Sequence, residues 1–92
     1  MDLKQAVGLA KQHILELFAE EELSNVGLEE VELDEGANEW IVTVGFSRPW
    51  DQPRSALAAL TQQTFPRRSY KVVRISNASN QVLSVKNREA QS

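Results

Sequence analysis

The residue types that could carry catalysis are sparse in this sequence. His13 is its only histidine and it contains no cysteine, so a nucleophilic triad would need His13 to meet a distant serine and aspartate. We expect His13 instead to be a solvent-facing or half-buried residue of a helix. The glycines are scattered and form neither a phosphate-binding loop nor a dinucleotide-binding fingerprint. The sequence therefore predicts a protein that is not an enzyme and needs no cofactor.

Metal binding has equally little support. A single histidine excludes a two-histidine site, and the acidic residues after position 28 supply only carboxylates: Glu29, Glu30, Glu32 and Asp34. These residues alternate along a predicted strand, whereas oxygen ligands must wrap around an ion from a loop. We predict no metal site.

Residue types suited to binding are better represented, and they gather in the second half. Six arginines are interleaved there with two aromatic residues, Trp50 and Tyr70. Tryptophan and arginine are the pair most enriched at hot spots of protein interfaces. We predict a contact surface on the proline-flanked loop 48–54 and the basic region 67–74, made of Arg48, Trp50, Arg54, Arg67, Arg68, Tyr70 and Arg74. In the alternative interpretation Trp50 folds back and plugs the end of the core.

The charges divide unevenly along the chain. Its 92 residues carry a net charge of −3, from 10 basic and 13 acidic residues. Eleven acids and two bases lie in residues 1–46, whereas eight bases and two acids lie in residues 47–92. Either acidic and basic strands neutralise each other across a sheet, or the two signs serve a charged partner or a second copy of the chain.

Nucleic acid is a competing partner for the basic half. Its arginines suit phosphate contacts, and Arg88 adds to those of the predicted contact surface. Trp50 and Tyr70 could stack on bases. The acidic total argues against this function, because nucleic-acid-binding domains are usually basic overall.

Periodicity predicts the elements that position these residues. Residues 3–22 form an amphipathic helix capped by Asp2, with an apolar stripe of Leu3, Val7, Ala10, Ile14, Leu17 and Phe18. The charge of Glu20, Glu21 and Glu22 should fray its last turn or end it near position 22. Strands at 28–34 and 39–46 flank a turn at 35–38, where Gly36 and Asn38 can take positive φ. Alternation places Trp40, Val42, Val44 and Phe46 on one face of the second strand.

A second hairpin follows, with strands at 69–76 and 81–87 and a turn at 77–80. Val73, Ile75, Leu83 and Val85 are predicted to face the core. Between the hairpins, residues 55–63 favour a short helix that Pro66 closes. The opposite face of the sheet carries Ile41, Thr43, Tyr70 and Val72, which is more apolar than a water-facing sheet requires, so another segment or another chain should cover it.

These elements predict one α+β domain: an N-terminal helix packed on a four-stranded antiparallel meander sheet, with the short helix inserted between the hairpins. The ordered core should span residues 3–87, followed by a loose tail at 88–92. No apolar run approaches the length of about 20 residues that spans a membrane, and no secretory signal opens the chain. We therefore expect a cytoplasmic protein.

The order of these patterns resembles the PepSY and cystatin-like group of small domains. The resemblance is carried by the acidic strand Val31-Glu32-Leu33-Asp34, the strand Trp40-Ile41-Val42-Thr43-Val44 and the hairpin containing Tyr70-Lys71-Val72-Val73-Arg74-Ile75 and Val82-Leu83-Ser84-Val85. It covers about residues 6–86, with 47–68 as an insertion. The Gln-x-Val-x-Gly loop of cystatins and the Asp-x-x-Thr-Gly turn of PepSY domains are both absent. The resemblance implies a non-catalytic module that binds or inhibits another protein.

The function that the sequence predicts is a small protein-interaction module of the inhibitor, immunity or regulatory kind. It binds another protein, and self-association through the sheet face or the opposed charges is a further prediction. The alternative is a nucleic-acid-binding accessory protein that uses the arginine-rich half.

Overall fold

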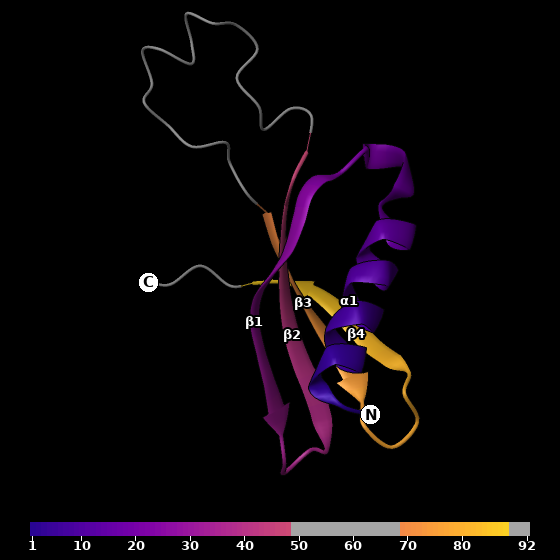
Figure 1. Ribbon diagram of the computed structural model, residues 1–92, viewed down its shortest axis with the longest axis vertical. Helices are drawn as coiled ribbons and strands as arrows, with labels where there is room; N and C mark the ends of the chain where they lie inside the picture. The colour runs from indigo at the N-terminus through magenta and orange to yellow at the C-terminus, as the bar shows by residue number, and fades with distance from the viewer. Residues whose placement is uncertain (49–68, 89–92) are drawn as a thin grey trace, which may run out of the picture.

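The computed structural model describes residues 1–48 and 69–88 (Figure 1). Helix α1 (Leu3–Leu17) is followed by a 3-10 turn, η1 (Ala19–Glu21). Four strands follow: β1 (Ser24–Asp34), β2 (Glu39–Ser47), β3 (Ser69–Ser76) and β4 (Val82–Asn87). The predicted helix at 55–63, most of the loop 48–54 and the tail after position 88 lie outside the described residues.

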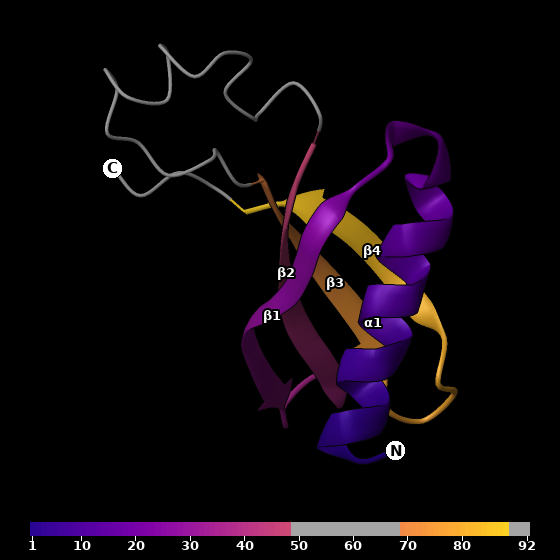
Figure 2. The ribbon, with the colours of Figure 1, turned by 45° about the horizontal axis from the view of Figure 1, so that its top comes forward.

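The strands form one antiparallel sheet in the order β1-β2-β3-β4, so the predicted meander is confirmed. Helix α1 packs on one side of this sheet, against β2 and its neighbours β1 and β3 (Figure 2). The predicted α+β architecture, with a helix on a four-stranded antiparallel sheet, is therefore correct.

Helix α1 begins as predicted and ends earlier. Asp2 accepts a hydrogen bond from the backbone N–H of Gln5, whose side chain accepts one from the backbone of Asp2, which closes a capping box. The helix ends at Leu17 rather than near position 22, and Glu22 takes a left-handed conformation at φ 52°. Carboxylates are unfavourable at the negative end of the helix dipole, which agrees with an early end.

The buried stripe of the helix is narrower than the sequence predicts. Ala6, Ala10 and Ile14, spaced by four residues, have no exposed surface. Leu3 and Leu17, which the prediction included in the stripe, are 48% and 55% exposed. Small residues at the contact let the helix approach the sheet closely, and this leaves the flanking leucines outside the interface.

The face of the sheet under the helix is built from cross-strand rows. One row consists of a valine from every strand: Val31, Val42, Val73 and Val85. The next row contains Leu33, Trp40, Ile75 and Val82. β-Branched residues pack well in such rows, and these valines lie in or against the core.

Strand β4 differs from the prediction at one core residue. Leu83 was expected to face the core with Val85, yet it is 52% exposed, and Val82 packs against the core instead. The register shifts between the pairs Arg74–Ser84 and Ile75–Val82, so Leu83 is an extra residue opposite this step. A bulge of this kind reverses the alternation, which strict period two cannot anticipate.

Strand β1 is also longer than predicted, because it begins at Ser24 rather than at position 28. In the structure its first residues form irregular pairs with β2, and Asn25 takes φ 55°. In the following turn the expected positive φ occurs at Asn38 but not at Gly36.

Candidate functional site

The sheet has a second face, opposite the helix, that no other described helix or strand covers. We call it the open face; the register places on it Gly27, Glu30, Glu32, Asp34, Glu39, Ile41, Thr43, Gly45, Tyr70, Val72, Arg74, Ser76, Ser84, Lys86 and Arg88. Its rows lie between the rows of the core because side chains alternate along each strand. The open face is our candidate site.

The rows of the open face run from acidic to basic. The central row contains Glu30, Thr43, Val72 and Lys86, one residue from each strand. On one side of it lie Glu32, Ile41 and Arg74, and on the other lie Gly27, Gly45 and Tyr70. Carboxylates thus line the β1 edge, small and apolar side chains occupy the middle, and cations line β3 and β4.

The middle of the open face is hollowed. An open depression of about 220 Å³ lies over Ile41, Thr43 and Val72, and its rim includes Glu30, Glu32 and Arg88. Thr43 is only 5% exposed, whereas Glu30 and Arg88 are exposed. An apolar floor between charged rims is the layout expected of a surface that binds a partner.

The described residues do not neutralise the charges at the two edges of the open face. Among the described residues Glu30, Glu32 and Lys86 have no ion pair. Strands β1 and β4 lie at opposite edges of the sheet. In the described part of the chain, the expected neutralisation of acidic by basic strands occurs on this face only between Glu39 and Arg74, at 3.0 Å.

Tyr70 is already engaged on this face. The guanidinium carbon of Arg88 lies 3.9 Å from the centre of the Tyr70 ring, within the range of a cation–π contact. The backbone N–H of Arg88 also donates to the Tyr70 carbonyl at 3.2 Å. Arg88 therefore covers one side of the ring that the sequence suggested for stacking.

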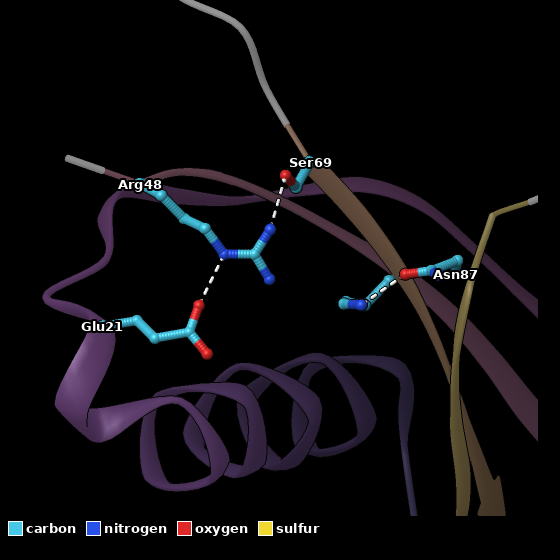
Figure 3. Close-up of polar contacts among 5 residues, drawn as sticks. Glu21, Arg48, Ser69 and Asn87 are labelled. Carbon is cyan, nitrogen blue, oxygen red and sulfur yellow. Dashed lines mark hydrogen bonds and ion pairs between the residues drawn. The ribbon is translucent and has the colours of Figure 1, made fainter. Parts of the chain in front are cut away.

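A second polar region, the cation cluster, lies where the end of α1 meets the sheet (Figure 3). It consists of Glu21, Arg48, Ser69, Lys71 and Asn87. Arg48 Nε donates to Glu21 Oε1 at 2.6 Å, and its Nη1 donates to Ser69 Oγ at 3.1 Å. Lys71 Nζ donates to Asn87 Oδ1.

Two phenylalanines hold the cations of this cluster. The rings of Phe18 and Phe46 lie 5.9 Å apart, and the Arg48 guanidinium lies over both of them. Lys71 Nζ lies 5.4 Å from the centre of the Phe18 ring. Arg48 and Lys71 thus have both aromatic contacts and hydrogen-bond acceptors from the chain itself.

The pKa of the Lys71 ammonium is lowered from its ordinary value of 10.5. The largest cause is burial, which disfavours the charged form, and the second is the charge of Arg48; Glu21 opposes both. A lysine of this kind can act as a nucleophile where a substrate reaches it. Here its ammonium donates to Asn87, so we interpret the cluster as a structural closure of the gap between α1 and the sheet.

The structure separates the residues that the sequence assigned to one contact surface. Tyr70 and Arg74 lie on the open face, on the same strand. Arg48 lies in the cation cluster on the helix side, with its side chain only 17% exposed. Trp50, Arg54, Arg67 and Arg68 lie outside the described residues.

The contact surface predicted from the sequence does not include several residues of the open face. Glu30, Glu32 and Lys86 contribute to the predicted charge asymmetry, but none of them was assigned to that surface. The signal was present, because alternation places these residues on the same face as Ile41, Thr43 and Val72. Their neighbours across the sheet depend on strand order, which the alternation does not contain.

Three further observations concern the described residues. Within 1–48 and 69–88, no three His, Cys, Asp or Glu side chains gather as metal ligands. No helix in these ranges is long and apolar enough to cross a membrane. His13 lies half-buried on α1.

Comparisons of the chain with protein-family models, with curated proteins and with solved structures found no match.

Proposed function

We propose that this protein is a non-enzymatic protein-interaction module and that the open face is its binding surface. The observation that carries the proposal is the central hollow, in which the apolar Ile41 and Val72 flank the buried Thr43 between charged residues. An apolar centre surrounded by charge is typical of interface cores and rims. Within residues 1–48 and 69–88, Glu30 and Lys86 form no ion pair, so the described part of the chain leaves these charges to a partner.

A protein fits this face better than a nucleic acid does. Phosphates would be attracted to Lys86 and Arg88 but repelled by the carboxylates of Glu30 and Glu32 across the same hollow. A protein surface can present both signs of charge and apolar side chains together. The proposed contact surface therefore shares Tyr70 and Arg74 with the surface predicted from the sequence. It lies on the sheet and does not include the 48–54 loop.

The resemblance to PepSY and cystatin-like domains supports the same class of function. It implies a non-catalytic module, in which a helix on a sheet presents a surface to another protein. An inhibitor, an immunity protein and a regulatory protein all fall within this class. A cytoplasmic location is part of the same proposal.

Site-specific photo-crosslinking tests this proposal. A benzophenone amino acid is placed at Ile41 or at Val72, and at exposed Lys4 on the helix as the matched control. In extract of the native host, we expect an adduct of defined mass from Ile41 and Val72 and none from Lys4. The same adduct from all three positions, or none from the open face, would contradict the assignment.

Nucleic-acid binding is tested separately by titration with single-stranded DNA and RNA at low salt. The proposal expects no binding. Binding that falls steeply as salt rises and disappears on Arg88→Ala would favour the nucleic-acid alternative and overturn the assignment to proteins.

A further inference from the structure

We propose that the partner on the open face is a second copy of this chain, related by a two-fold axis that runs parallel to the strands between β2 and β3. This inference rests on the proposed function and names its partner. It predicts an isologous dimer in which two sheets pack face to face and the two helices lie on the outside.

Charge selects this arrangement. With the strands of two sheets aligned, a two-fold axis in the interface runs either across the strands or along them. An axis across the strands places β1 on β1 and brings the carboxylates of Glu30 and Glu32 against their own copies. An axis along the strands places β1 on β4, so that each acidic edge meets a basic edge. Like charges in contact are unfavourable, so the second arrangement is favoured.

The central row of the open face then matches residue by residue. A two-fold rotation about an axis along the strands leaves each row at the same position along the strands. It reverses the order of the residues within the row. Glu30 therefore faces the partner's Lys86, and Thr43 faces the partner's Val72. The ion pair occurs twice in the dimer because of the symmetry.

The neighbouring row matches in shape. Tyr70 on β3 faces the partner's Gly45 on β2, since these two residues are paired across the centre of the sheet. Gly45 is buried and has no side chain, so no side chain stands opposite the large ring and the Arg88 guanidinium stacked on it. Large side chains opposite small ones let two sheets interdigitate.

The size of the face predicts a weak dimer. Four strands spaced by about 4.8 Å, each about eight residues long at about 3.3 Å per residue, make a face of about 500 Å². Two such faces bury about 1,000 Å², which is below the range of about 1,200–2,000 Å² for stable interfaces. We therefore expect a dissociation constant in the micromolar range or above, so that monomer and dimer are both populated.

Sedimentation equilibrium of the purified full chain over a wide concentration range tests the inference. We expect a monomer–dimer equilibrium that weakens as salt rises. Glu30→Lys and Lys86→Glu should each raise the dissociation constant by about tenfold, because each replaces two ion pairs by two like-charge contacts. The double variant Glu30→Lys/Lys86→Glu should restore the wild-type value. Glu16→Lys, on the exposed face of α1, is the matched control and should change nothing.

The outcomes separate the inference from the proposed function. A monomer at all concentrations would overturn the dimer, while a crosslink from Ile41 to a different protein would still support the open face as a binding surface. A dimer unaffected by Glu30→Lys, or not restored in the double variant, would place the interface elsewhere. Melting curves monitored by circular dichroism verify that each variant is folded, since both sites are exposed.

Discussion

Two neighbouring rows of the same sheet contain very different residues. Under the helix, the row of Val31, Val42, Val73 and Val85 has a valine from every strand. One residue further along, the row of the open face contains Glu30, Thr43, Val72 and Lys86. The strands and their hydrogen bonds are shared, so backbone pairing does not explain the difference.

The contrast shows what each face contributes. The valine row is in or against the core, and burial of apolar surface there supplies most of the stability of the domain. The open face retains an apolar centre at Ile41 and Val72 but separates its charges at the edges. A face with this composition adds less to folding than the valine row does.

The largest expected difference between the two faces comes from a matched pair of isoleucines. Ile75 is fully buried under the helix, and Ile41 is half-buried on the open face. Ile75→Ala should lower the free energy of unfolding by about 2–5 kcal/mol, because it leaves a cavity. Ile41→Ala should lower it by about 1 kcal/mol or less.

Urea denaturation followed by tryptophan fluorescence measures both effects. Where Ile75→Ala does not fold, Ile75→Val provides the comparison, with an expected loss of about 0.5–1.5 kcal/mol. Equal losses at the two positions would mean that the open face is as well packed as the core, and would remove the basis for calling it a binding surface.

The cation cluster predicts the next largest effect. The Arg48 side chain is 17% exposed and bonded to Glu21 and Ser69, whereas that of Arg74 is 43% exposed and paired with Glu39. Arg48→Met should lower the free energy of unfolding by about 1–3 kcal/mol, because it leaves partly buried acceptors unpaired. Arg74→Met is the control and should lower the free energy of unfolding by about 0–1 kcal/mol. A neutral Arg48→Met would show that the cluster is not structural.

The bulge in β4 predicts a smaller difference. Val82 packs against the core and Leu83 is exposed, although simple alternation predicts the reverse. Val82→Ala should lower the free energy of unfolding by about 1 kcal/mol, and Leu83→Ala by about 0.5 kcal/mol or less. A larger loss at Leu83, measured by thermal or urea denaturation, would place the register one residue away from that described here.

The smallest expected effect is the pH dependence caused by Lys71. Its pKa is lowered in the folded state, so between that value and 10.5 the unfolded chain binds more protons at this site than the folded chain does. The contribution of Lys71 to the free energy of unfolding is therefore unfavourable at neutral pH, and it improves as the pH rises towards 10.5. Lys71→Met should remove this contribution to the slope of the free energy of unfolding against pH. Coinciding slopes for the wild-type and variant proteins, from urea denaturation between pH 7 and 10.5, would contradict the lowered pKa.

Much of the fold could be predicted from local patterns. The helix and its Asp2 cap, the two hairpins and the core residues of β2 follow from periods of 3.6 and two and from short polar turns. The errors occur where the chain departs from a regular period. Leu83 lies at a bulge, and the residues from Ser24 to Gly27 pair irregularly, so alternation fails in both places.

The candidate site was less predictable than the fold. Composition predicts a contact surface made largely of arginines. Arg48, however, is oriented towards Glu21 and two phenylalanines on the helix side of the sheet. The carboxylates of the open face were recognised only as an acidic strand. Their relation to Lys86 depends on four strands pairing in order, which involves residues far apart in the sequence.

By itself, the sequence determined most of the secondary structure, the apolar faces of β2 and β3 and the opposite charges of the two halves, because these depend on residues close together in the chain. The tertiary structure decided the bulge in β4 and the register of the strands, and therefore which acidic and basic residues share a row of the open face. Register depends on pairing between residues far apart in the chain, and no short segment encodes it. The charge difference between the halves thus becomes a gradient across one open face.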